Sequence, residues 1–319
     1  MLSQSWSQGP SLLSTRVNSN ASLEGLKKGS RVGDGAANEV AAYILDHGGR
    51  AGVPATALVD LRCSAASSAR GGVKRGALQE FVTSVGDAEE MSPSLFDVRD
   101  VHGIAILDMR IAQCDRHGGN VLVVKATGSG VGGVPSGGSV EDDDFGSAFP
   151  PSCSSSSPPS FGQLNKQRYR LVPIDNGYAF PSSMADLTFE WAWWPQASEP
   201  FTADDLRYVA ALDAEEDLAL LSRHGLPLRP KCADVVRTCT ACLQVCAARG
   251  MTPADIAGVM CRDVAPPGTD DMASFKLGGM SVLEKLSRRA KQMSDASSSE
   301  AYVCTLRTLL EEYCDEVLS

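Results

Sequence analysis

The 319-residue sequence lacks long hydrophobic runs. No run approaches the ~20 apolar residues that a membrane-spanning helix requires. The first thirty residues are rich in Ser and Asn, and they lack the apolar central stretch of a secretory signal peptide. We therefore expect a cytoplasmic chain without a transmembrane segment, whose thiols stay reduced.

Positive charge is also scarce. The sequence has 29 Lys and Arg against 39 Asp and Glu, so its formal net charge is -10. An acidic surface repels phosphates, which argues against sequence-independent binding of nucleic acid. We expect no nucleic-acid partner, although a local basic site is compatible with this charge.

Cysteine, in contrast, is plentiful, with ten residues. Cys239, Cys242 and Cys246 follow a C-x2-C-x3-C spacing, but the nearest histidine that could complete a zinc site is His224. The same spacing places the three cysteines on one face of a predicted helix. We favour the interpretation that they are small apolar core residues.

The first third of the chain contains two predicted helices. One runs from Asn38 to Gly49 and closes on a glycine pair, and the stronger one spans residues 92–113, where Ser or Asp can cap its start. Between them we predict a strand over residues 53–63, a loop over 64–76 and a short apolar segment over 77–82.

A β-hairpin is predicted next. The apolar run Val121–Val124 and the segment Arg168–Asp175 are both typical of strands, and residues 126–166 between them are a Gly-, Ser-, Asp- and Pro-rich low-complexity insertion. The hairpin would bring Asn120 and Asp175 to the same end of the sheet.

The residues after Pro195 are predicted to be mainly helical. Thr202 and Thr252 are predicted caps, each with an acidic residue three positions later. A weak linker follows over about 263–279, and a helix over 301–318 closes the chain.

Two short motifs carry the chemistry. "DRHGGN" places Asn120 five positions after Asp115, which is the spacing of a kinase catalytic loop, and "IDNG" places Gly177 two positions after Asp175. In phosphoryl transfer an Asp can act as base while Asn and Asp oxygens bind magnesium. Each motif alone is weak, since Asp115 could cap a loop and Asp175 could sit in a turn. Their order around two apolar strands strengthens the prediction.

The segments "LDMRIAQCDRHGGNVLV", "LVPIDNGYAFP" and "FEWAWWPQASEPFT" resemble the phosphatidylinositol 3-/4-kinase family, most closely its type II and plant gamma-type 4-kinases. The likeness extends over residues 25–262, apart from the insertion. It implies an α+β, bilobed protein-kinase-like fold with a mainly helical C-lobe. ATP and Mg²⁺ are the cofactors that it implies.

The resemblance also implies roles for catalytic residues. Asp115 matches the catalytic-loop aspartate, and Asn120 and Asp175 match the magnesium ligands. His117 matches the histidine of the Asp-Arg-His motif, either as a base or transition-state stabiliser or as a residue that orders the loop.

Nucleotide-binding residues are implied in the same way. Glu39 matches the helix glutamate that pairs with the ATP-binding lysine, unless it lies on a solvated helix face. Gln79, Glu80, Phe81 and Val82 match the hinge whose backbone holds adenine, and the alternative for Phe81 and Val82 is plain interlobe core.

Three tryptophans, Trp191, Trp193 and Trp194, follow the second motif. Core packing is the favoured interpretation. Exposed tryptophans there would instead contact the membrane surface that holds a lipid substrate.

One part of the family pattern is missing. Residues 1–24 contain no lysine and no strand with a phosphate loop, and Lys27 and Lys28 align with a later family segment. We therefore expect an incomplete N-lobe, without the main electrostatic clamp on ATP.

These expectations divide the chain into four parts. They are a disordered N-terminus (1–24), a partial N-lobe with hinge (25–82), a C-lobe (83–262) and a linker with a C-terminal helix (263–319). The leading function is phosphorylation of phosphatidylinositol, at the inositol 4-position, by a cytoplasmic or peripheral membrane enzyme. The alternatives are a protein Ser/Thr kinase and a catalytically dead binding module.

Overall fold

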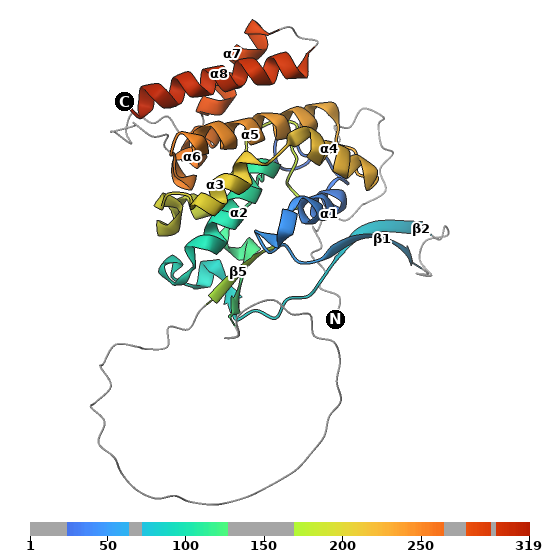
Figure 1. Ribbon diagram of the computed structural model, residues 1–319. Coiled ribbons are helices and arrows are strands. Elements are labelled where there is room, and N and C mark those ends of the chain that lie inside the picture. The colour runs from blue at the N-terminus through green and yellow to red at the C-terminus, as the bar shows by residue number, and fades with distance from the viewer. Residues whose placement is uncertain (1–23, 64–71, 127–168, 265–278, 295–297) are drawn as a thin grey trace, which may run out of the picture.

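Helices and strands are mixed in this protein, as expected for an α+β chain. The computed structural model describes residues 24–63, 72–126, 169–264, 279–294 and 298–319 (Figure 1). The helices are α1 Gly35–Leu45, α2 Val98–Ile111, α3 Ala203–Ala210, α4 Ala214–Arg223, α5 Pro230–Ala248, α6 Pro253–Met260, α7 Val282–Met293 and α8 Ser299–Val317. The strands are β1 Thr56–Cys63, β2 Gly72–Gln79, β3 Gly86–Asp87, β4 Val121–Lys125 and β5 Tyr169–Pro173.

β1 and β2 form an antiparallel pair that projects from the helical body beside α1 (Figure 1). The register runs from Thr56 opposite Gln79 to Cys63 opposite Gly72. The predicted loop over 64–76 is therefore wrong for residues 72–76, while residues 64–71 lie outside the described part. Backbone pairing with β1 outweighs the weak strand propensity of the glycines in β2.

β3, β4 and β5 form a second antiparallel sheet, with β4 in the middle. Val121 lies opposite Pro173 and Lys125 opposite Tyr169, which confirms the predicted hairpin. The amide of Ile174 donates to the carbonyl of Asn120 (2.9 Å), so Asn120 and Asp175 do lie at the same end. Residues 127–166 of the predicted insertion lie outside the described part.

α2 is the central helix of the body and contacts α1, α3, α5 and α6. It begins at Val98, later than predicted, because Asp97 caps it by accepting a hydrogen bond from the amide of Arg99. All its residues from Asp100 to Ile111 are buried, rather than only one apolar stripe.

The C-terminal half is helical, as predicted. Thr202 and Thr252 both form capping boxes, with Asp205 and Asp255 respectively. The sequence predicted only one helix after the linker, which is wrong, because α7 precedes α8 and begins with a further capping box. α5 lies between α2 and the α7–α8 pair (Figure 1).

The cysteines of α5 are core residues, which confirms the favoured interpretation. Cys239, Cys242 and Cys246 are fully buried, and burial raises the pKa of the Cys239 thiol well above its ordinary value. The sulfur of Cys246 lies 3.9 Å from that of Cys242 and 3.8 Å from that of Cys314 in α8. Within the described ranges, no three His, Cys, Asp or Glu side chains are arranged to hold a metal ion.

The core interpretation is confirmed for two of the three tryptophans. Trp191 and Trp194 are buried in the core, whereas Trp193 is 59% exposed. Of the helices that the structure describes, none combines the length and the apolar character needed to cross a bilayer.

Candidate functional site

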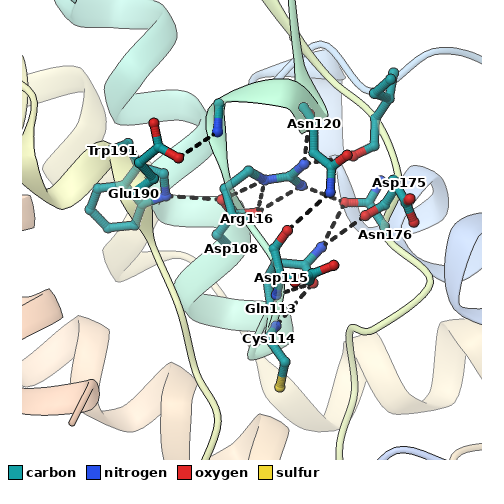
Figure 2. A network of polar contacts seen from close by, with 12 residues as sticks. Asp108, Gln113, Cys114, Asp115, Arg116, Asn120, Asp175, Asn176, Glu190 and Trp191 are labelled. Atoms are coloured by element: carbon teal, nitrogen blue, oxygen red, sulfur yellow. Dashed lines mark hydrogen bonds and ion pairs between the residues drawn. The ribbon is translucent and has the colours of Figure 1, made fainter. Parts of the chain in front are cut away.

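The two sequence motifs meet at one end of the β4–β5 pair. α2 ends where Ala112 adopts a left-handed conformation (φ 54°), and the chain then turns through Asp115 into the short 3-10 helix Gly118–Asn120 that precedes β4. β5 delivers Asp175 to the same place. Figure 2 shows Asp115, Asn120 and Asp175 gathered around one polar network.

Arg116 is the centre of that network, although no role was predicted for it from the sequence. Its side chain is 1% exposed. It forms an ion pair with Asp108 of α2 (2.9 Å) and donates to the carbonyls of Asn120 (2.9 Å) and Ile174 (2.6 Å). A further bond reaches the side chain of Asn176 (2.7 Å). Arg116 thus fastens the first motif to the second and both to the end of α2.

Asp108 completes the anchor from within α2. Its carboxylate also accepts a hydrogen bond from the indole nitrogen of Trp191 (2.9 Å), so the buried tryptophan and the arginine share one carboxylate. Burial raises the pKa of Asp108, and the charge and hydrogen bonds of Arg116 oppose that shift. Such a buried charge requires its partner.

Asn120 and Asp175 offer the oxygens that a magnesium ion needs. The amide nitrogen of Asn120 donates to the carbonyl of Asp115 (3.0 Å), which leaves its oxygen as the free acceptor. Asp175 has a left-handed backbone (φ 54°), and its carbonyl accepts a bond from Gln113 (3.4 Å). One carboxylate and one amide oxygen suit Mg²⁺, which takes its other ligands from phosphates and water. The donor set therefore fits this ion.

Asp115 has a partner that the sequence did not predict. The ammonium group of Lys27 lies 2.8 Å from its carboxylate, and both side chains are about 30% exposed. Partial burial disfavours the charged amine, but the hydrogen bond and the charge of Asp115 raise the pKa of Lys27. Lys27 contacts Asp115 rather than Glu39, so it does not occupy the position of an ATP-binding lysine.

The turn that carries Lys27 is firmly docked. Ser30 donates to the carbonyl of Lys27 through both its amide (3.0 Å) and its hydroxyl (2.6 Å). The amide of Ser182 donates to the carbonyl of Gly29 (3.0 Å), which itself has φ 82°. A Cβ atom at Gly29 would lie 2.6 Å from the amide nitrogen of Ser183, so only glycine permits this close approach.

His117 lies at the rim of the site. Its Nδ1 atom is 2.9 Å from the carboxylate of Glu89, and the imidazole is 46% exposed. The hydrogen bond from His117 lowers the pKa of Glu89. The side chain can therefore be reached from solvent, and within the described residues it contacts Glu89 rather than Asp115.

Glu39 lies against the second motif instead of on a solvated face. Its helix, α1, is held there by Asn38, whose amide donates to the carbonyls of Gly177 and Ala179 (2.9 Å each). Among the described residues, the Oε2 atom of Glu39 is buried without a partner. Burial raises the pKa of Glu39 to about 7, hydrogen bonds with Asn176 and the charge of Arg116 oppose the shift, and the charge of Asp175 adds to it.

Replacing Glu39 by glutamine is expected to stabilise the protein at pH 8 by about 1–3 kcal/mol. The folded state raises the pKa of Glu39 from 4.5 to about 7, so the protonated group favours folding below pH 4.5. That contribution is lost as the pH rises through 7, where the buried carboxylate becomes charged. Thermal unfolding of both proteins between pH 4 and pH 8, without metal, measures the effect.

The gain from Glu39→Gln should shrink towards pH 4. Glu216→Gln, at an exposed position of α4, is the matched control and should change stability by less than ~0.5 kcal/mol at either pH. A lower melting temperature for Glu39→Gln at pH 8 would mean that the carboxylate has a stabilising partner.

The predicted hinge begins at Gln79, the last residue of β2, and continues beyond the strand. The side-chain amide of Gln79 donates to the hydroxyl of Thr56 (2.9 Å), and the amide of Glu80 donates to the carbonyl of Ala55 (2.8 Å). Phe81 is 63% exposed, so its alternative interpretation as interlobe core is wrong. Within the described residues, the backbone amides of Phe81 and Val82 have no acceptor. Among the residues that the structure describes, no hydrogen bond joins the hinge to Asp115, Asn120 or Asp175.

Comparison with known proteins agrees with the motifs. The family model described as phosphatidylinositol 3- and 4-kinase matches residues 13–256. Phosphatidylinositol 4-kinase gamma 4 of Oryza sativa subsp. japonica is 36% identical over 304 residues, which cover 92% of this chain and 44% of that protein.

Two proteins of Arabidopsis thaliana are similarly related. Phosphatidylinositol 4-kinase gamma 3 is 34% identical over 92% of this chain and 46% of its own length. Phosphatidylinositol 4-kinase gamma 5 is 37% identical over 76% of this chain and 35% of its own length. The chain thus spans less than half the length of these relatives. Because the family model covers most of its residues, the chain belongs to the phosphatidylinositol 3- and 4-kinase family.

Proposed function

We propose that this protein transfers a phosphoryl group from Mg-ATP to phosphatidylinositol, at the inositol 4-position that the names of its relatives imply. The observation that carries the proposal is that Arg116, which directly follows Asp115, donates hydrogen bonds to Asn120 and to both neighbours of Asp175. In this proposal residues 25–82 and 83–262 are the two lobes, and the nucleotide lies between them.

Each residue then has a separate task. Asp175 and Asn120 hold the magnesium ion, which supplies charge neutralisation at the phosphates when it is bound. Asp115 accepts the proton of the inositol hydroxyl, and Lys27 orients its carboxylate. The free amides of Phe81 and Val82 hold adenine, while the exposed imidazole of His117 faces the reacting groups.

The lipid reaches the site from a membrane surface. Trp193 is the exposed member of the aromatic run that follows the second motif. An indole ring is well suited to the headgroup region of a bilayer. Peripheral binding through Trp193 would bring the inositol ring to Asp115 without any spanning helix.

A second function, a catalytically inactive binding module, is favoured by one observation. Among the described residues, no Lys or Arg contacts the buried oxygen of Glu39. In a protein kinase, this glutamate pairs with the lysine that clamps the ATP phosphates. Without such a cation, transfer would be slow although the fold and the magnesium ligands are present.

Transfer of labelled phosphate from Mg-ATP should separate these functions. The purified chain is offered vesicles that contain phosphatidylinositol together with a generic protein substrate. We expect label in the lipid, at least ~100-fold reduced in Asp115→Asn because the base is lost. Asp263→Asn, at an exposed position, is the matched control and should retain the wild-type rate.

The remaining outcomes discriminate between the alternatives. Label only in the protein substrate would contradict the lipid acceptor and indicate a protein kinase. If neither substrate is labelled, although thermal unfolding shows that the purified chain is folded, the result would support the inactive binding module.

A further inference from the structure

A second polar site lies outside the candidate active site. A cavity of about 420 Å³ opens between the 3-10 helix His47–Gly49, the first turn of α2, β5 and α3. Its walls carry four arginines together with one acidic and one aromatic side chain. These lining residues are Arg50, Arg99, Arg170, Asp204, Arg207 and Tyr208. The volume is within the range of small-molecule sites.

The cavity is separate from the phosphoryl-transfer site. Arg170 lies opposite Val124 in the β4–β5 pair, whereas Pro173, two residues before Asp175, lies opposite Val121. Asp175 is therefore five positions beyond Arg170 along a nearly extended chain, a span of roughly 15 Å. The two sites share a strand but lie towards its opposite ends.

Arg170 is held in place by a buried carboxylate. Its Nε atom donates to both oxygens of Asp100 (2.8 and 2.9 Å). Asp100 is itself fixed by the amide of Leu171 (2.9 Å) and is 4% exposed. The two terminal nitrogens of Arg170 have no acceptor among the described residues, and the side chain is 57% exposed. This is a pre-positioned guanidinium with two terminal nitrogens, and hence four N–H donors, to spare.

Arg50 lines the same cavity and is also firmly placed. Its guanidinium lies over the ring of Tyr208, 4.6 Å from the centroid. It pairs with Asp204 (2.6 Å) and Asp205 (3.2 Å), and its side chain is only 12% exposed. The stacked ring and the two carboxylates fix the plane of the arginine.

The other two arginines are less closely paired. Arg99 is exposed and has no side-chain partner within the described ranges. Among the described residues Arg207 pairs with Asp204 alone, at 3.2 Å across an exposed turn of α3. The four arginines therefore outnumber the carboxylates that contact them, which are Asp100, Asp204 and Asp205. The arginines exceed these carboxylates by one, although the chain as a whole has a net charge of -10.

We propose that this arginine pocket binds an anion that carries two or more phosphate groups. Guanidinium groups recognise phosphate through paired, charge-assisted hydrogen bonds, and four of them line this one cavity. A phosphorylated inositol headgroup and a soluble polyphosphate share this chemistry. The site does not depend on the proposed transfer reaction, because it uses none of the residues assigned to it.

Calorimetric titration tests the pocket directly. The probes are inositol 1,4-bisphosphate and inorganic pyrophosphate, in buffer with a chelator so that no magnesium bridges a phosphate to Asp175. We expect both Arg170→Gln and Arg99→Gln to bind at least one probe about 10-fold more weakly than wild type does, since each removes charged donors. Arg99 has no partner to lose, so Arg99→Gln should fold normally and give an unchanged melting temperature.

Two control variants locate the binding. Arg289→Gln removes an exposed arginine from α7, far from the cavity in the chain, and should bind as wild type does. Asp175→Asn should also leave the affinity unchanged. Absence of binding of both probes to wild type would overturn the proposal. So would binding that survives in Arg99→Gln and Arg170→Gln.

Vesicle sedimentation distinguishes the source of the phosphates. Wild type and Arg99→Gln are mixed with phosphatidylcholine vesicles that contain a minor fraction of either phosphatidylinositol 4-phosphate or phosphatidylserine. Loss of sedimentation in Arg99→Gln only with the phosphoinositide vesicles would identify a lipid headgroup as the ligand. Equal sedimentation of the two proteins, with the calorimetric difference intact, would identify a soluble polyphosphate.

Discussion

Replacing Arg116 by methionine is expected to lower the free energy of unfolding by about 3–5 kcal/mol. Methionine fills a similar length but donates no hydrogen bonds. The carboxylate of Asp108 would stay buried without its counter-charge, and the carbonyls of Asn120 and Ile174 would lose a donor. Denaturant unfolding at pH 7, followed by tryptophan fluorescence, measures the loss.

Two further variants show whether the loss comes from the stranded charge. Arg223→Met, at an exposed position of α4, should change stability by less than ~0.5 kcal/mol. The double variant Arg116→Met with Asp108→Asn should recover part of the loss, because no uncompensated charge is then buried. If Arg116→Met alone unfolded like the Arg223 control, the network of Figure 2 would not anchor the two motifs.

Replacing Asp175 by asparagine is expected to weaken Mg-ATP binding by about 10- to 100-fold, because the magnesium ion loses one charged ligand. Asn120→Asp should weaken it less, since it adds charge at the other ligand. Asp115→Asn should leave the affinity unchanged and abolish transfer, because Asp115 acts on the acceptor hydroxyl. Calorimetric titration of the three variants with Mg-ATP compares them.

The measurement also tests whether the three residues have separate roles. The same titrations with ATP and a chelator, in place of magnesium, should show little difference between Asp175→Asn and wild type. If Asp115→Asn lost affinity for Mg-ATP as severely as Asp175→Asn does, the assignment of one residue to the acceptor and the other to the metal would be wrong.

Several features could be predicted because their causes are local. The capping boxes at Thr202 and Thr252 need only residues three positions apart. The β4–β5 hairpin follows from two apolar runs that a low-complexity segment separates. The cysteine face of α5 follows from helical spacing, and a buried thiol needs no partner. Because the hairpin was predicted, the position of Asn120 beside the strand that leads to Asp175 could be predicted as well.

Other features had weak or misleading local signals. Residues 72–76 were expected in a loop because glycine and basic residues disfavour strands, yet β1 supplies the backbone partners that make β2 a strand. α7 has a capping box at Ser281 and Glu284, but the linker composition just before it hid the start. Local composition does not reveal whether a partner strand or a neighbouring helix is present.

The sequence by itself determined the family motifs, the helix caps and the hairpin that unites Asn120 with Asp175. Only the tertiary structure decided which charges are paired. Lys27 contacts Asp115 although the two residues are far apart in the chain, and Arg116 pairs with the buried Asp108. Among the described residues, one oxygen of Glu39 is buried without a partner. The identity of a charged residue does not reveal whether its side chain is solvated or buried against a partner. The partner depends on packing between elements, which leaves no periodic trace in the sequence.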